Sequence, residues 1–283
     1  MSKVENKISS FKTIRTFLKV GACSEAVMNV LDRAYEHPLE LEEKASSIFA
    51  GGIMQQGYQC GMIWGAALAA GAESYRLYGT GQQAEAEAVI AAQRLVESFN
   101  NQNKNINCLE ITDTDWTSKF EMFKYMITGG PIGCFRMSGR YAQLAYSELD
   151  SNFSSEHPEV SSASVSCAAM LAKKMGASEM QVVMASGLAG GIGLCGGACG
   201  ALGAAVWIIG IKAIEEGVAG NNLWDSKIVK SRVDQAIDLF LQQSDHQFEC
   251  EKIVGHKFAS VAEHSKYVCD GGCSKIIDIL AKQ

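Results

Sequence analysis

The sequence predicts an all-α protein made of two tandem helical-bundle repeats related by internal duplication. Apolar residues recur with helical spacing along nearly the whole chain, and no segment sustains the alternation of apolar and polar residues that marks a strand. The cysteines also occur twice in the same order. A chain of 283 residues with 47% hydrophobic content is long enough for two cored units of about 140 residues.

The duplication is visible in the spacing of the cysteines. The four pairs and their offsets are Cys60 and Cys199 (139), Cys134 and Cys273 (139), Cys108 and Cys250 (142), and Cys23 and Cys167 (144). The segment Phe-Ala-Gly-Gly-Ile at 49–53 returns as Leu-Ala-Gly-Gly-Ile at 188–192, and a Cys-Gly pair follows each copy. We therefore predict a first repeat at residues 1–150 and a second at 151–283, joined by a polar linker over residues 150–158.

The first helices of the first repeat follow from its apolar stripes. After Cys23, apolar residues from Val27 to Ala34 share one face, and the opposite face carries Glu25, Asn29, Asp32 and Arg33. Pro38 suits the first turn of a helix that runs towards Phe49.

Three further helices are expected in the first repeat. Residues 60–71 are apolar on all sides, as expected of a helix in the centre of a bundle. An alanine-rich run predicts another helix over residues 82–99. A stripe that contains Met137 and Tyr141 predicts a third helix after Cys134.

The second repeat contains the longest uncharged stretch of the chain. Residues 181–211 exceed the roughly 20 apolar residues that a bilayer requires, but they include nine glycines, which would break a simple spanning helix. We therefore expect a buried helix-loop-helix and no membrane span. A final helix is predicted after Cys273 from Ile276, Ile277 and Leu280.

Charge and termini limit the functional class. Acidic residues outnumber basic ones by 31 to 25, which gives a net charge of −6 and argues against the basic surface of a nucleic-acid binder. The N-terminus has polar and charged residues where a signal peptide would have an apolar core. We expect a cytoplasmic protein with no nucleic-acid partner, and we expect its five histidines at the surface.

Clustered thiols in a reducing compartment indicate metal or redox chemistry rather than structural disulfides. Most of the paired cysteines lie at or just before predicted helix starts, where free N–H groups and the helix dipole lower a thiol pKa. Cys108 and Cys250 are expected to precede polar loops or to lie within them. Glycines that precede the cysteines allow a loop to wrap an inorganic cluster and donate N–H groups to its sulfurs.

The second repeat has two additional cysteines, and several interpretations stay open. Cys195 and Cys269 each precede a paired cysteine by four residues, so a thiol-disulfide oxidoreductase using Cys195/Cys199 and Cys269/Cys273 is one alternative. A structural helical module with inert buried thiols is another. Four thiolates also suit zinc, although the short Cys-x-x-Cys spacing of structural zinc is absent, and so is the Cys-x-x-Cys-His sequence of covalent haem.

The same residues resemble the family of redox-active proteins named C_GCAxxG_C_C after its cysteine pattern. The first half is similar to one copy, with Cys23, Gly51-Gly52, Cys60-Gly61, Cys108 and Cys134. The second half is similar to another copy, with Cys167, Gly190-Gly191, Cys199-Gly200, Cys250, and Cys269 or Cys273. Since a related domain occurs in split-Soret cytochromes beside an iron-sulfur centre, the resemblance implies a redox metal protein.

We therefore expect an electron-transfer protein with an iron-sulfur cluster in each repeat, either 2Fe-2S or 4Fe-4S. The expected cluster ligands are Cys23, Cys60, Cys108 and Cys134 in the first repeat and Cys167, Cys199, Cys250 and Cys273 in the second. Cys195 and Cys269 are further candidate metal ligands. The expected partner is a redox partner protein or a small electron carrier. A homodimer and an oxidoreductase activity are both compatible with these patterns.

Overall fold

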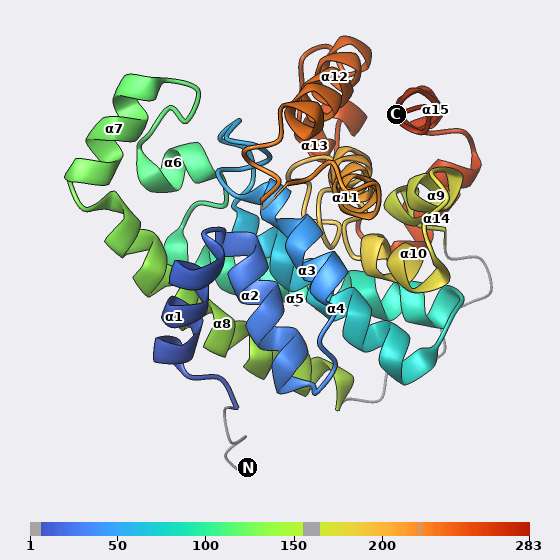
Figure 1. Cartoon of the computed structure of the whole chain (residues 1–283). Coiled ribbons are helices and arrows are strands. Elements are labelled where there is room, and N and C mark those ends of the chain that lie inside the picture. Colours follow the sequence, from blue (N-terminus) through green and yellow to red (C-terminus); the bar gives the residue numbers. More distant parts are fainter. Residues whose placement is uncertain (1–6, 155–164, 221) are drawn as a thin grey trace.

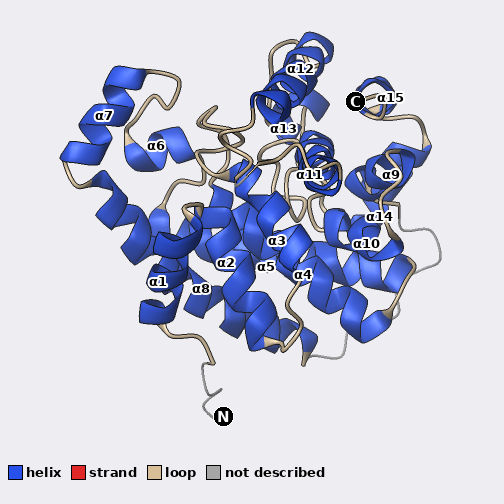
Figure 2. Cartoon of the chain, viewed as in Figure 1, coloured by secondary structure: helices blue, strands red, loops and turns tan. Residues whose placement is uncertain are grey.

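A computed structural model describes residues 7–154, 165–220 and 222–283 of the chain. Its described residues form fifteen α-helices and one 3-10 helix, and their only extended pairings are two isolated β-bridges. Figure 2 shows helices throughout, which confirms the all-α prediction. The helices assemble side by side around a common interior (Figure 1).

The helices fall into two successive sets. The first set is α1 (Ser10–Val20), α2 (Cys23–Ala34), α3 (Glu40–Ser46), η1 (Ser47–Phe49), α4 (Gly61–Tyr78), α5 (Gln82–Asn103), α6 (Cys108–Thr112), α7 (Lys119–Ile127) and α8 (Gly130–Phe153). The second set is α9 (Cys167–Lys174), α10 (Glu179–Ser186), α11 (Gly200–Glu215), α12 (Lys227–Gln243), α13 (Cys250–Val254), α14 (Val261–Cys269) and α15 (Ser274–Leu280). Helices α2 to α8 correspond one by one to α9 to α15, as internal duplication requires.

The two repeats meet about a pseudo-two-fold axis. Helix α4 packs against α10, and their counterparts α11 and α3 pack against each other in the same way. In a two-fold arrangement, only residues on the axis touch their own counterparts. Three pairs of residues 139 positions apart do so: Glu42 with Gln181, Gln59 with Ala198, and Trp64 with Gly203.

The centre of the core is formed by α4 and α11, whose side chains are buried along most of their length. Trp64 on α4 is fully buried and stacks on Phe49 at a centroid distance of 4.7 Å. A Cβ at Gly203 would lie 2.1 Å from the Trp64 ring, so the glycine leaves room for the indole. Buried side chains from both repeats form one continuous cluster. The uncharged segment 181–211 is thus the predicted buried helix-loop-helix, made of α10, the loop that follows it and α11.

Some local predictions need correction. Asp32, predicted on the polar face of α2, is buried because α3 packs over it. Pro38 lies just before the N-cap of α3, Leu39, rather than inside its first turn. Residues 150–153 of the expected linker are the last turn of α8, and residues 155–158 lie outside the described residues. The boundary between the two predicted domains therefore stays a prediction.

The prediction of surface histidines is wrong for His264. This side chain is 3% exposed and packs edge-on against Phe258 at a centroid distance of 4.9 Å. Burial lowers the pKa of His264 from 6.5 to about 4 because the interior disfavours the charged imidazolium. His246 and His256 are exposed and His37 is half-buried, whereas His157 lies outside the described residues.

None of the helices in the described part of the chain combines the length and the apolar character that crossing a membrane requires.

His264 makes stability depend on pH. Between pH 6.5 and pH 4 the unfolded chain binds a proton at this position and the folded protein does not, so stability falls as the pH falls through this window. We expect the loss attributable to His264 to be roughly 2 kcal/mol. The variant His264→Leu should therefore gain stability relative to the wild type between pH 7 and pH 4.5 in urea unfolding. The exposed control His246→Leu should show no such gain, and an equal gain in both variants would contradict the assignment.

Candidate functional site

Four cysteines of the first repeat come together from four separate helices. Cys23 begins α2, Cys60 caps the N-terminus of α4, and Cys108 begins α6. Cys134 is the fifth residue of α8. The Cys60 thiol interacts electrostatically with Cys23, Cys108 and Cys134, and Cys108 interacts with Cys23 and Cys134. These four residues are called the first quartet.

The second repeat repeats this arrangement. Cys167 begins α9, Cys199 caps α11, Cys250 begins α13, and Cys273 caps α15. The Cys250 thiol interacts with Cys199, Cys167 and Cys273. These residues are the second quartet. Cys108 and Cys250 do not lie within loops, since each begins a five-residue helix, and each of these helices is followed by a loop.

A short β-bridge aligns two cysteines within each quartet. Around the bridge of Gln59 with Asn107, the Cys60 N–H donates to the Ile106 carbonyl at 2.7 Å and the Cys108 N–H donates to the Tyr58 carbonyl at 2.8 Å.

The second repeat has the matching bridge of Ala198 with Glu249. There the Cys199 N–H donates to Phe248 at 2.7 Å and the Cys250 N–H donates to Gly197 at 2.6 Å. The bridges thereby hold Cys60 beside Cys108, 48 residues away in sequence, and Cys199 beside Cys250, 51 residues away.

A left-handed loop precedes the bridge in each repeat. All five residues from Gly51 to Gln55 have positive φ, between 46° and 73°, and all five from Gly190 to Leu194 have positive φ between 59° and 78°. The backbone of Gly51 hydrogen-bonds the Cys23 sulfur, and that of Gly190 hydrogen-bonds the Cys167 sulfur. Each loop therefore brings main-chain donors to the first cysteine of its quartet.

Burial controls the protonation of the thiols. It raises the pKa of Cys23 and of Cys167 to about 12, although backbone hydrogen bonds act in the opposite direction. Burial also raises the pKa of Cys60 and Cys199 well above the ordinary value. The expectation that helix N-termini lower these pKa values is therefore wrong in its net result, because desolvation outweighs the backbone donors.

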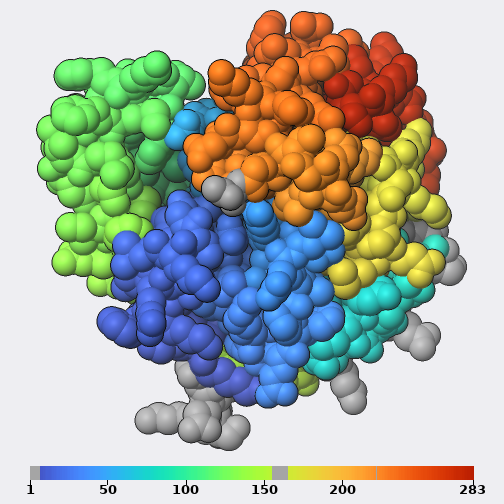
Figure 3. All heavy atoms as spheres, in the orientation of Figure 1, coloured from blue at the N-terminus to red at the C-terminus, as the bar shows by residue number. Residues whose placement is uncertain are grey.

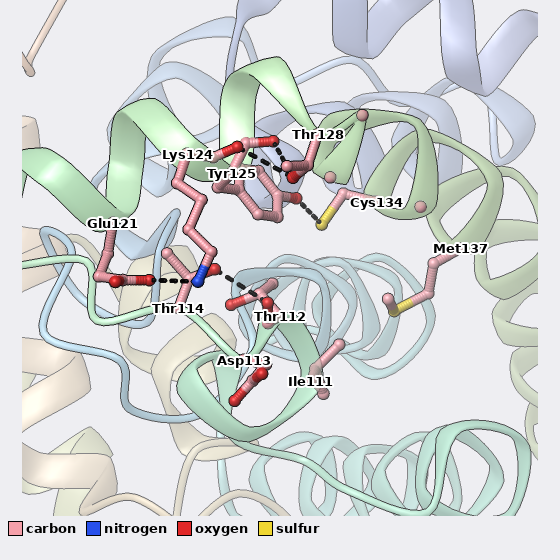
Figure 4. A pocket seen from close by; sticks show the side chains of 13 residues that line it. Ile111, Thr112, Asp113, Thr114, Glu121, Lys124, Tyr125, Thr128, Cys134 and Met137 are labelled. Atoms are coloured by element: carbon pink, nitrogen blue, oxygen red, sulfur yellow. Dashed lines mark hydrogen bonds and ion pairs between the residues drawn. The ribbon is translucent and has the colours of Figure 1, made fainter.

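The last cysteine of each quartet is only half-buried and has a tyrosine donor. The Tyr125 hydroxyl donates to Cys134 Sγ at 3.0 Å (Figure 4), and Tyr267 hydrogen-bonds Cys273. Cys134 lines a cavity of about 360 Å³ between α6, α7 and the start of α8. Lys124, Glu121 and Asp113 project into its polar side in Figure 4. The first quartet can thus be reached from solution at Cys134.

Cys195 and Cys269 stand apart from the quartets. Cys195 is half-buried, and its electrostatic partners are Glu97 and Lys257. Cys269 is exposed at the last residue of α14. All ten cysteines are free thiols, so neither Cys195/Cys199 nor Cys269/Cys273 is joined. The structure brings together the eight paired cysteines and leaves these two outside.

The surroundings of the first quartet suit a sulfur-rich group. Three buried polar atoms have no hydrogen-bond partner among the described residues, namely Ser24 Oγ, Gln59 Nε2 and Asn107 Oδ1, and each belongs to a residue adjacent in sequence to a quartet cysteine. Buried polar atoms normally have partners. The Ser24 hydroxyl and the Gln59 amide nitrogen are donors of the kind that cluster sulfurs accept, whereas Asn107 Oδ1 is an acceptor. A Cβ at Gly61 would lie 2.9 Å from Cys23 Sγ, so this glycine keeps space beside the thiol. The four thiols, the backbone donor of Gly51 and the space beside Cys23 suit an iron-sulfur cluster.

Within residues 7–154, 165–220 and 222–283, no group of three or more His, Cys, Asp or Glu side chains is placed to hold a metal ion. The thiols of each quartet are electrostatic neighbours rather than a preformed single-ion site.

Comparison with protein-family models gives two matches to one family. The family described as "Putative redox-active protein (C_GCAxxG_C_C)" matches residues 22–147 and again residues 162–283. Each match contains one complete quartet. Searches of curated proteins and of solved structures found no match to the chain.

Gly52 is the most constrained glycine of the left-handed loop in the first repeat. It has φ of +73°, and a Cβ there would lie 2.3 Å from the Tyr58 carbonyl oxygen. We expect Gly52→Ala to lower the free energy of unfolding by about 3 kcal/mol, because backbone atoms must move as well as φ. Urea unfolding of the purified variant measures this loss.

Gly21→Ala is the matched control, since Gly21 is left-handed with φ of +78° and a Cβ there would have nothing within 4 Å. It should lose only about 1 kcal/mol from the unfavourable φ. Equal losses in the two variants would show that the close approach of Gly52 to Tyr58 has no energetic role.

Proposed function

We propose that this chain, which belongs to the C_GCAxxG_C_C family, is an electron-transfer protein in which each repeat binds an iron-sulfur cluster through its cysteine quartet. The observation that carries the proposal is the convergence of eight cysteines into two equivalent quartets. Inert core thiols have no reason to be gathered from four helices in this way twice. The cluster supplies one-electron chemistry when it is bound, and four thiolates are its usual ligands.

The chain contributes the environment that tunes such a group. Backbone donors from the left-handed loops reach Cys23 and Cys167, and tyrosine hydroxyls reach Cys134 and Cys273. Hydrogen bonds to sulfur and burial are the main protein factors that set a reduction potential. The thiolate ligands of a cluster bind two or more different iron atoms, whereas all the ligands of a single metal ion must meet at one atom. The proposal therefore concerns a cluster of either nuclearity.

The half-buried Cys134 is the proposed point of electron exchange in the first repeat. Its cavity is open to solution and lined by charged and hydroxyl-bearing side chains (Figure 4). A small electron carrier or a redox partner protein that enters this cavity would reach the quartet at Cys134. The remaining members, Cys23, Cys60 and Cys108, are buried.

Thiol-disulfide exchange is less well supported as the main activity. Its attacking group is a thiolate, and reactive cysteines have lowered pKa values. Burial instead raises the pKa of Cys195 to about 12, and it raises the pKa of its proposed partner Cys199 as well. Both thiols of that pair are therefore poor nucleophiles at neutral pH.

Iron and acid-labile sulfide in anaerobically purified protein test the proposal. The wild type should contain both, and Cys60→Ala or Cys199→Ala should each retain about half, because each removes one ligand from one quartet. The double variant should contain neither. Cys269→Ala is the control and should keep the wild-type content. Metal-free protein with ten titratable thiols, or bound zinc without sulfide, would refute the proposal.

A further inference from the structure

The two cysteine sites are joined by a buried hydrogen bond that crosses the pseudo-two-fold axis. The N–H of Ala198 donates to Gln59 Oε1 at 2.8 Å. Gln59 is the β-bridge residue that precedes Cys60, and Ala198 is the β-bridge residue that precedes Cys199. A single side chain of the first repeat therefore connects the bridges that align both quartets.

The second repeat is shaped to receive this glutamine. A Cβ at Gly197 would lie 2.3 Å from Gln59 Oε1, so only glycine leaves the space that the amide occupies. The pseudo-symmetric position in the first repeat is Tyr58, and the counterpart of Gln59 is Ala198. The connection is therefore asymmetric, since the first repeat supplies the side chain and the second supplies the backbone donor and the space.

A second contact links the same two bridges. Tyr58 of the first repeat stacks on Phe248 of the second, with ring centroids 4.2 Å apart and planes 15° from parallel. The Tyr58 carbonyl accepts the Cys108 N–H, and the Phe248 carbonyl accepts the Cys199 N–H. The stacked residues thus hold cysteines that belong to different quartets.

Gln59 also has an unused donor. Its side chain is fully buried, Oε1 is bonded to Ala198, and Nε2 has no partner among the described residues. A buried N–H group without a partner is costly, and an added acceptor would relieve that cost.

We infer that Gln59 is a positioning residue that couples the two cysteine sites, so that loosening the backbone at one site makes local opening at the other site more frequent. Because Gln59 and the Tyr58–Phe248 stack connect the two bridges, loosening one bridge loosens the other. Coupling of this kind is reciprocal between sites. The coupling would regulate the two sites of the proposed function, so its biological meaning rests on that proposal. Its test requires no cluster.

Thiol reactivity in the metal-free, reduced full-length protein measures the coupling. Buried thiols react with N-ethylmaleimide only during local opening, and mass spectrometry gives a rate for each cysteine. Gln59→Met leaves the Ala198 N–H without its acceptor, so alkylation of Cys199 and Cys250 in the second repeat should accelerate about fivefold or more. Gln235→Met on the exposed face of α12 is the matched control and should change no rate.

Phe248→Leu tests the coupling from the other side and keeps the hydrogen bond of Gln59. It should accelerate alkylation of Cys108 in the first repeat, because Tyr58 loses its stacking partner. If Gln59→Met does not fold, this second variant decides the question alone. Unchanged rates at Cys199 and Cys250 in folded Gln59→Met, or an equal acceleration of all eight quartet cysteines, would overturn the inference. An equal acceleration would mean that Gln59 supports only global stability.

The two proposals fail separately. Protein without iron or sulfide that still shows the cross-repeat acceleration would retain the coupling and lose the cluster. Protein with both elements and no cross-repeat acceleration would retain the cluster and lose the coupling.

Discussion

Five successive residues in the left-handed conformation, once in each repeat, are the constraint on which the cysteine sites depend. L-residues pay roughly 1–2 kcal/mol each for this conformation, and the loops include Ile53, Met54, Ile192 and Leu194. Burial offsets that cost, since Ile53 and Ile192 are completely removed from solvent. Backbone hydrogen bonds such as Gly57 to Gly51 at 2.9 Å and Gly196 to Gly190 at 3.0 Å hold the loops closed. The strain is thus balanced by the core beneath it and orients backbone donors at the first cysteine of each quartet.

The pseudo-two-fold axis explains where the repeats have diverged. A residue on the axis meets its own counterpart, so two identical large or charged residues would collide or repel each other. The chain has Trp64 opposite Gly203 and Glu42 opposite Gln181, whose amide donates to the carboxylate at 2.9 Å. Gln59 opposite Ala198 follows the same rule. Differences between the repeats are therefore steric and electrostatic requirements of their contact, and one of them reaches the cysteine sites.

The environment of the thiols combines two opposing influences. Helix N-termini and loop N–H groups favour thiolate, whereas burial favours the neutral thiol and prevails in the chain by itself. A cationic metal centre would reverse that balance, because metal binding deprotonates its ligands. The green surface in Figure 3 includes the segment from α6 to α8, and the cavity between these helices opens the first quartet to solution at Cys134.

The helical class, the duplication and the membership of the two quartets could all be predicted from the order of amino acids, because helical periodicity and cysteine spacing are written along the chain. Packing in three dimensions set the rest. Only packing buries Asp32 and His264, since neither local pattern shows what covers these residues. Only the fold gives the thiols of Cys23 and Cys167 their raised pKa, because desolvation depends on neighbours distant in sequence. The bond from Ala198 to Gln59 spans 139 residues, a separation at which no periodicity of either segment predicts a contact.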